Sequence, residues 1–236
     1  MKEEELIGVI GSSGADLVAL QQCSEERCGR ISTACGYEYV GNWAEPDRGD
    51  GVALLSKMPL GQHDGKTSIP IGSYSYWDEV KPIRRAFVLA AYVSRFQLPL
   101  LVTQLERWSE SDDEKKRQEK QVESLLKPDS SMEWLQSNQR IIVGDLDVEP
   151  SSPLIAKLRS GGELQEAFEG HSEATYPAQA PVKKVDYVFY HPELCRVVSS
   201  RVIREPICCD HLPLLVEFER PKVGVVVGVV NWSCDS

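Results

Sequence analysis

Short apolar stretches alternate with polar, turn-forming segments along the whole chain. Most of these stretches have the length of a strand and are rich in Val, Leu and Ile, which favours buried β-strands over amphipathic helices. We therefore predict strands over residues 15–22, 37–43, 51–57, 84–93, 98–106, 140–147, 183–190, 195–203, 211–219 and 222–231.

Helical patterns separate some of these strands. Residues 24–34 begin with Ser24, an N-cap residue, and carry two acids in the first turn, where the helix dipole favours them. Residues 111–126 alternate acids and bases and end in an apolar face, which predicts a mostly exposed helix docked by one end. A third helix should follow Pro150, and a fourth should precede the first strand.

Strands dominate the second half of the chain, so we expect two packed sheets and not one parallel, doubly wound sheet. The predicted fold class is α/β (α+β), a four-layer α/β/β/α sandwich with two mixed, mainly antiparallel sheets. Single sandwiches of this size are common, so residues 1–236 are expected to form one domain.

The composition narrows the class of protein. An apolar fraction of 42% and a charged fraction of 26% are ordinary for folded, soluble chains. The formal charge of −10 argues against broad, non-specific nucleic-acid binding, and the basic pair Lys183 and Lys184 is expected to be solvated surface. The seven cysteines form no CxxC pair, and neither an export signal nor a membrane-spanning stretch is visible. We expect free thiols and an intracellular location, cytoplasmic or nuclear, with a monomer favoured.

Two acids lie at the carboxyl end of the predicted strand 140–147. Asp145 and Asp147 are two positions apart, so on an extended chain both side chains would leave on one face and could converge on one cation or phosphate. Mg²⁺ prefers one or two carboxylates with water and substrate phosphate, which suits such a sparse cluster. The alternative is an acidic turn that caps the helix at Ser151.

A second group of polar residues lies further along the chain. Asp186 interrupts an apolar strand, where a buried carboxylate without a partner would be costly. Asp210 and His211 stand at the entrance to the strand 211–219. We expect His211 to be the partner of Asp186, because an acid that hydrogen-bonds an imidazole fixes its tautomer and supports its protonated form.

These segments, in this order, resemble the endonuclease/exonuclease/phosphatase, or deoxyribonuclease-I-like, superfamily: ADLVALQQ, GVALLSK, LLVTQLE, IIVGDLD, EATYP with KKVDYVFY, and CDHLPLLVEF. The resemblance covers nearly the whole chain. The stretch RRAFVLAAYVSRFQLPLLVTQLE with the charged helix after it is most similar to the 5′-tyrosyl-DNA phosphodiesterase branch.

The resemblance implies a role for each of these acids. Asp145 and Asp147 match the family pair that contacts the scissile phosphate and orients water, although Asp147 replaces the usual Asn and adds negative charge. Asp210 would act as a base, orient water or bind the metal. His211 would stabilise the transition state, supported by Asp186.

Two departures from the family pattern suggest weakened activity. The metal-binding Glu is Gln22 here, whose amide oxygen can bind Mg²⁺ or Mn²⁺ without supplying charge. Gln104 stands where a group able to transfer a proton is expected, and with Tyr176 it is a candidate substrate contact. Glu25 or Glu106 could replace the missing ligand, although both are expected to be surface acids.

The order of the strands differs from that of the family. The strand that should come first, ending in a phosphate-binding Asn, is replaced by the C-terminal stretch 222–231, which places Asn231 at the binding position. Circular permutation would explain this, since the family's first and last strands are neighbours. The alternative is a truncated gene model whose Val-rich tail completes the edge of a sheet.

The resemblance implies a metal-dependent phosphodiesterase acting on a nucleic acid or another phosphodiester such as a protein–DNA linkage. The alternative is an inactive family member that binds a phosphorylated or nucleic-acid partner. Trp43, Trp77 and Trp108 could stack on bases or pack in the fold.

Overall fold

The computed structural model describes residues 3–43, 51–60, 87–105, 111–127, 138–168, 173–221 and 225–233. Its helices are α1 (Glu3–Ser13), α2 (Glu25–Cys35), α3 (Asp112–Leu126) and α4 (Pro153–Gly162), with a 3-10 turn η1 (Ser94–Phe96). The strands are β1 (Leu17–Gln21), β2 (Glu38–Trp43), β3 (Gly51–Ser56), β4 (Phe87–Val93), β5 (Leu98–Gln104), β6 (Ile141–Asp145), β7 (Gln165–Glu166), β8 (Asp186–Tyr190), β9 (Arg196–Val202), β10 (Leu214–Arg220) and β11 (Val225–Ser233).

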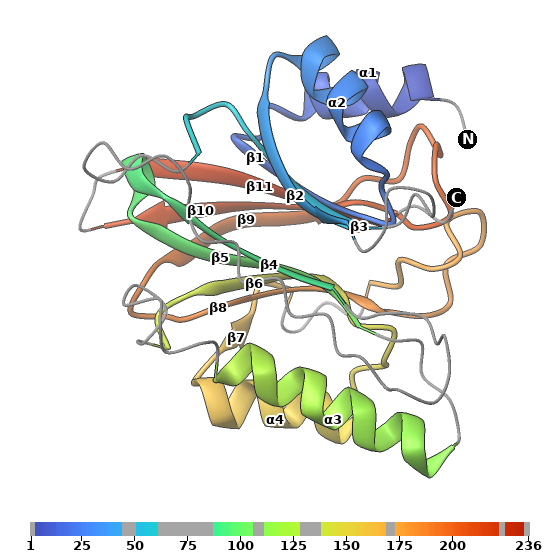
Figure 1. The fold of residues 1–236 in the computed structure, drawn as a ribbon, viewed down its shortest axis with the longest axis vertical. Helices are drawn as coiled ribbons and strands as arrows, with labels where there is room; N and C mark the ends of the chain where they lie inside the picture. The colour runs from blue at the N-terminus through green and yellow to red at the C-terminus, as the bar shows by residue number, and fades with distance from the viewer. Residues whose placement is uncertain are drawn as a thin grey trace.

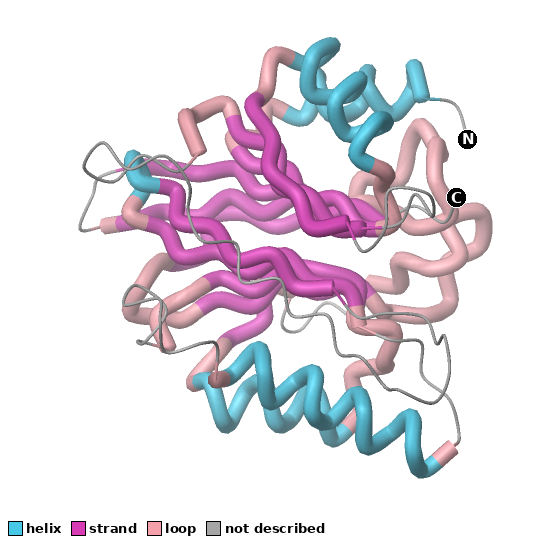
Figure 2. The backbone as a smooth tube through the Cα atoms, viewed as in Figure 1, coloured by secondary structure: helices cyan, strands magenta, loops and turns pink. Residues whose placement is uncertain are grey.

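Two sheets face each other, and a pair of helices covers the outer face of each (Figure 1, Figure 2). One sheet has the order β2-β3-β1-β11-β10-β9, and the other has the order β4-β5-β6-β8-β7. Only the pairs β1–β11 and β5–β6 are parallel among the ladders described. The predicted four-layer sandwich with mainly antiparallel sheets is therefore confirmed.

Three apolar clusters fill the spaces between the four layers. The central cluster lies between the sheets and includes Leu17, Val143 and Val216, all fully buried. A second cluster joins α1 and α2 to the outer face of the first sheet, and a third joins α3 and α4 to the second sheet. Because both faces of the central strands are covered, their sequences are nearly continuous apolar runs.

The helices begin where the sequence predicts. Ser24 caps α2 by accepting a hydrogen bond from the Arg27 backbone N–H, and Gly36, at a left-handed φ of 72°, ends it. Ser152 caps α4 in the same way, and Pro153 occupies the first turn. Each predicted strand is confirmed as an element, although residues 84–86, 106 and 222–224 of the predicted ranges lie outside the described residues.

The C-terminal strand lies inside its sheet. β11 pairs in parallel with β1 and antiparallel with β10, so each of its edges is bonded to another strand. A tail that completes a sheet edge is therefore excluded, and β11 lies beside β10, as the resemblance implies for the family's first and last strands. In the register, Asn231 stands opposite both Ala19 and Leu214.

Two expectations are wrong in part, namely that all thiols are free and that both Lys183 and Lys184 are solvated surface, which holds for Lys183 alone. Cys209 is disulfide-bonded, whereas Cys23, Cys28, Cys35, Cys195 and Cys208 are free thiols and Cys234 lies outside the described residues. Cysteine spacing along the chain does not reveal which thiols folding brings together.

Lys184 is also not a surface residue. Its ammonium is buried and paired with Glu166, and it lies 5.5 Å from the centre of the Tyr187 ring. The carboxylate and the ring offset the desolvation of the charge. None of the helices in the described ranges is long and apolar enough to cross a bilayer.

Candidate active site at one end of the sandwich

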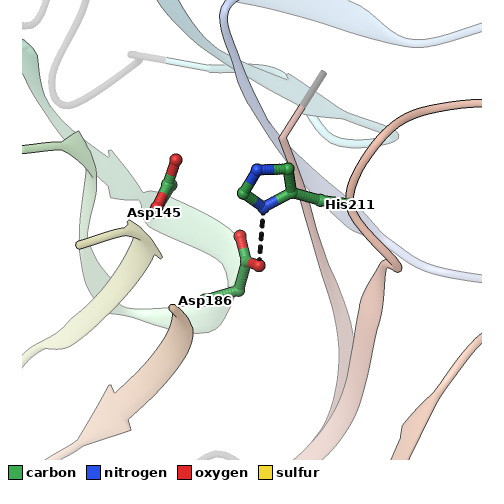
Figure 3. A group of neighbouring side chains, drawn as sticks. All are labelled: Asp145, Asp186 and His211. Carbon is green, nitrogen blue, oxygen red and sulfur yellow. Dashed lines mark hydrogen bonds and ion pairs between the residues drawn. The ribbon is translucent and has the colours of Figure 1, made fainter. Parts of the chain in front are cut away.

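Three buried side chains converge where the two sheets meet at one end. The ligand atoms of Asp145, Asp186 and His211 all lie within 4.8 Å of one another, the one such group of His, Cys, Asp and Glu among the described residues (Figure 3). Asp145 ends β6 and Asp186 begins β8, and the two are direct cross-strand partners. His211 arrives from the other sheet, three positions before β10 begins.

Strand geometry explains why both acids point into the site. In β6, Val143 belongs to the central core, and in β8 Val188 does. Because side chains alternate between faces, Asp145 and Asp186 project on the same side, toward the space between the sheets. Their exposed fractions are 5% and 1%.

The predicted pair of Asp186 and His211 is confirmed. His211 Nδ1 lies 2.8 Å from Asp186 Oδ2, and its Nε2 lies 3.9 Å from a carboxylate oxygen of Asp210. Burial alone would lower the pKa of His211, but the charge of Asp186 and their hydrogen bond, aided by Asp145 and Asp210, raise it to about 10. The imidazole is therefore protonated at neutral pH.

Asp145 also binds its proton more tightly than usual, which in a carboxyl group favours the uncharged form. Burial, together with the negative charges of Asp186 and Asp147, raises the pKa of Asp145 to about 8, against the smaller lowering effect of His211. Four carboxyl groups and one imidazole thus act on one another here, and two of the carboxyl groups, those of Asp145 and Asp186, are buried with the imidazole. A cation near Asp145 would relieve this repulsion.

The route by which Asp147 reaches the site differs from the prediction. β6 ends at Asp145, and Asp147 has a left-handed φ of 49°, so the two acids do not share the face of one extended strand. A turn brings them together, and the Asp147 N–H donates a hydrogen bond of 3.0 Å to Asp145 Oδ1. The cap of α4 is Ser152, so the acids are not helix caps.

Gly144 does not break β6, which continues through it. A side chain at this position would meet the Thr103 carbonyl oxygen of β5 at 1.9 Å. The glycine allows β5 and β6 to approach closely just before Asp145, and it places Gln104 beside Asp145 in the register.

Among the other predicted site residues, Tyr176 contacts the buried group directly. The Tyr176 ring packs against the His211 imidazole, with centroids 4.8 Å apart. Gln22 follows β1 directly at a left-handed φ of 53° and is partly exposed. The backbone of Asn231 lies beside Leu214, three positions after His211. Glu25 is exposed in the first turn of α2.

Some predictions cannot be placed at the site. Glu106, Trp77 and Trp108 lie outside the described residues. Trp43 packs against the cluster beneath α1 and α2, and its indole N–H donates to the Cys23 carbonyl. This contact is typical of a packed tryptophan and not of a base-stacking surface.

One polar residue at this end was missed. Gln21 is 1% exposed, and within the described ranges neither its amide nitrogen nor its amide oxygen has a hydrogen-bond partner. It shares a face of β1 with Leu17 and Ala19 of the central core, so it borders the space between the sheets. The alternation in ADLVALQQ contains this signal, because Gln21 and not Gln22 continues the buried series.

The family comparison agrees with this geometry. A model of the endonuclease/exonuclease/phosphatase family matches residues 2–207. The chain belongs to this family. Hydrolysis of phosphate esters is thus the class of activity that family membership indicates. The sequence matches none of the curated proteins with which it was compared.

Solved structures of the family share the fold beyond the matched residues. A family member from Bacteroides vulgatus is 14% identical, with a TM-score of 0.69 over 92% of this chain and 90% of that chain. The mannosyl-6-phosphatase Bt3783 of Bacteroides thetaiotaomicron is 15% identical, with a TM-score of 0.67 over 91% and 89%. TDP2 of D. rerio, complexed with a single-strand DNA product, is 15% identical, with a TM-score of 0.62 over 91% and 90%.

Proposed function

We propose that the chain is a phosphodiesterase that uses Mg²⁺ or Mn²⁺ to hydrolyse a nucleic acid or a protein–DNA linkage, with low activity. The observation that carries the proposal is the burial of Asp145 and Asp186 against each other beside a protonated His211. Acids buried side by side are costly unless a cation or a proton offsets them. The shared fold with a phosphatase and with a protein bound to a DNA product supports this class of substrate.

The residues present fit a divalent cation. Asp186 Oδ1 is buried and has no hydrogen-bond partner among the described residues, and Asp145 is strongly desolvated. Hard cations bind such carboxylate oxygens, and Mg²⁺ keeps several waters besides. Asp145 and Asp186 would hold the ion, with Asp210 and Gln22 as the further candidate ligands. When bound, it would supply positive charge to the phosphate oxygens and lower the pKa of a bound water.

His211 and its neighbours would carry out the proton and hydrogen-bond chemistry. With Nδ1 committed to Asp186, the protonated Nε2 of His211 can donate to a phosphate oxygen that gains charge in the transition state. Asp210, near that nitrogen, would orient or deprotonate the attacking water. Asp147 and Asn231 would border the phosphate, and Gln104 would contact the substrate.

Low activity follows from the loss of charge at Gln22. A glutamate at this position would add a negative ligand at the end of β1, where the amide is neutral. We expect Gln22→Glu to raise Mg²⁺- or Mn²⁺-dependent cleavage of bis(p-nitrophenyl) phosphate by about tenfold or more, as a transition-state contribution of about 1.4 kcal/mol would give.

Gln97→Glu is the matched control. Gln97 is an exposed glutamine with nearly the same left-handed backbone, φ 48° against 53°, but it precedes β5 at the end away from Gln104. This variant should leave cleavage unchanged, whereas Asp145→Asn should abolish it. The proposed activity would be refuted if neither the unmodified chain nor Gln22→Glu cleaved the substrate, even with added Mg²⁺ or Mn²⁺.

The second candidate function is metal-independent binding of a phosphorylated partner. The neutral residues Gln22 and Gln104 favour it, because neither can supply charge or a proton. Isothermal titration separates the two: heat of binding with millimolar Mn²⁺ that disappears in Asp145→Asn supports the enzyme. Absence of metal binding together with retained binding of a phosphorylated oligonucleotide supports the binding protein.

A further inference from the structure

The catalytic imidazole is held by one continuous hairpin from two directions. Residues 175–183 fold back on themselves, with the Tyr176 N–H donating to the Lys183 carbonyl and the Lys183 N–H donating to the Tyr176 carbonyl, at 3.0 and 2.9 Å. Three residues later the same chain enters β8 at Asp186. Tyr176 and Asp186 therefore belong to one continuous segment of the chain.

Asp186 and Tyr176 contact different parts of His211. The Asp186 carboxylate lies in hydrogen-bond contact with Nδ1, at the edge of the imidazole. The Tyr176 ring lies against the imidazole with centroids 4.8 Å apart and planes tilted by 45°. The hydrogen bond to Nδ1 fixes the tautomer and limits rotation of the imidazole about Cβ–Cγ, and a ring packed against the imidazole narrows the remaining rotation.

Backbone hydrogen bonds join the same two segments. The Ala178 N–H donates to the Asp210 carbonyl at 2.6 Å, and the Leu212 N–H donates to the Thr175 carbonyl at 2.9 Å. The residues on either side of His211 are thus tied to the residues on either side of Tyr176. The position of the main chain is fixed here, so the orientation of the imidazole depends on side-chain contacts.

We infer that Tyr176 is a positioning residue, whose ring holds the plane of the His211 imidazole so that Nε2 faces the reacting phosphate. This inference deepens the proposed function and rests on it. It assigns to Tyr176 a role exerted through His211 by the ring face, and a substrate contact through the phenol hydroxyl is not required. Misplacing a reacting group by about 1 Å can lower the rate about a hundredfold, so loss of the Tyr176 contact should lower the rate measurably.

Two substitutions at Tyr176 separate the ring from the hydroxyl. Tyr176→Leu removes the ring and should lower kcat by about tenfold to a hundredfold with KM within about twofold, because orientation in the transition state is lost. Tyr176→Phe keeps the ring and should restore most of this loss. In a His211→Gln background, Tyr176→Leu should cause no further loss, as expected for residues that act through one another.

Tyr190→Leu is the matched control for loss of an aromatic contact. Tyr190 packs against Phe218 with centroids 5.4 Å apart at 58°, a geometry close to that of Tyr176 and His211. It stands at the other end of β8 from Asp186. Its substitution removes a comparable ring contact and should leave both the kinetics and the His211 signals unchanged.

The NMR signals of the histidine rings test the inference without any catalytic turnover. The chain has four histidines, so the His211 ring signals can be assigned by their loss in His211→Gln. Tyr176→Leu should shift and broaden these signals at constant pH, because the neighbouring ring field is removed and the imidazole gains rotational freedom. Tyr176→Phe and Tyr190→Leu should retain the unmodified line positions and widths.

Unchanged His211 signals in Tyr176→Leu, with the backbone amide spectrum preserved, would overturn the inference. So would a raised KM with unaltered kcat in Tyr176→Phe, which would show that the hydroxyl contacts the substrate. Inertness toward every phosphodiester would refute the proposed function alone, and the imidazole spectrum would still decide the role of Tyr176.

Discussion

Burial at the site disfavours the charged form of Asp145. Its carboxyl group is buried between Asp186 and His211, and burial is the largest cause of its raised pKa. The pKa of the neighbouring His211 is also raised, because the charge of Asp186 and their hydrogen bond outweigh the lowering effect of burial. Both groups therefore bind protons more tightly in the folded chain than in the unfolded chain.

This difference makes stability fall as pH rises. The pKa of Asp145 rises from 3.8 to about 8 on folding, and that of His211 from 6.5 to about 10. Each contribution is complete below the lower value and is lost as pH passes the higher one. In metal-free buffer with a chelator, we expect these two groups to lower the melting temperature between about pH 4 and about pH 10, most steeply from about pH 6.5 to about pH 8, where both contribute.

Asp145→Asn should flatten this decline, because the amide has no proton to lose. Asp112→Asn, which alters a carboxylate that is 90% exposed on α3, should retain the slope of the unmodified chain. Thermal denaturation followed by circular dichroism measures all three. Equal slopes for Asp145→Asn and the unmodified chain would contradict the assigned proton on Asp145.

Residue pairings at the site were predictable only where burial forced them. An acid inside an apolar strand needs a partner, and this reasoning led from Asp186 to His211. The turn that brings Asp147 to Asp145 depends on a left-handed backbone that Asp tolerates but does not require. Gln21 was not predicted, because the resemblance places the metal-binding position at its neighbour Gln22.

The elements that carry the site depend on one close approach between strands. β5 and β6 run in parallel, and the missing side chain of Gly144 lets them meet beside Thr103. This contact lies immediately before Asp145, so the position of the acid depends on it.

Gly144→Ala should therefore destabilise the fold by at least about 3 kcal/mol, the upper range for a forced steric insertion, and separate Asp145 from Gln104. Gly11→Ala is the control, since nothing lies within 4 Å of its added carbon and it stands inside α1. That variant should gain about 0.5–1 kcal/mol from helix propensity. Urea denaturation at constant slope measures both. A Gly144→Ala variant as stable as the unmodified chain would disprove the packing argument.

The helices and the longer strands could be predicted from periodicity and caps, but the pairing of strands at the edges of the sheets could not. The two-residue strand β7 has no pattern long enough to detect, and Glu166 within it explains why Lys184 could be buried. Pairing of sheet edges is a property of three-dimensional contacts and not of local sequence.

The whole molecule is assembled around a strand that comes last in the chain. β11 hydrogen-bonds β1 on one side and β10 on the other, and it packs across the sandwich against β6 and β8. Its position was predictable because the family resemblance left one place in the sheet vacant. Sequence order therefore matters less to this fold than the set of strand contacts.

A reordered chain tests this conclusion. Moving residues 225–236 ahead of residue 3 through a flexible Gly/Ser linker, and ending the chain after residue 221, keeps every strand contact and all seven cysteines and changes chiefly loop closure. Loop closure costs vary slowly with length, so the free energy of unfolding should differ by about 1–2 kcal/mol, as measured in urea. Deleting residues 225–233 without replacement should prevent folding, because β1 and β10 would each lose a ladder in the middle of the sheet. If the deleted chain folded as well as the original, or if the reordered chain stayed unfolded, the contacts of β11 could not be what organises the sandwich.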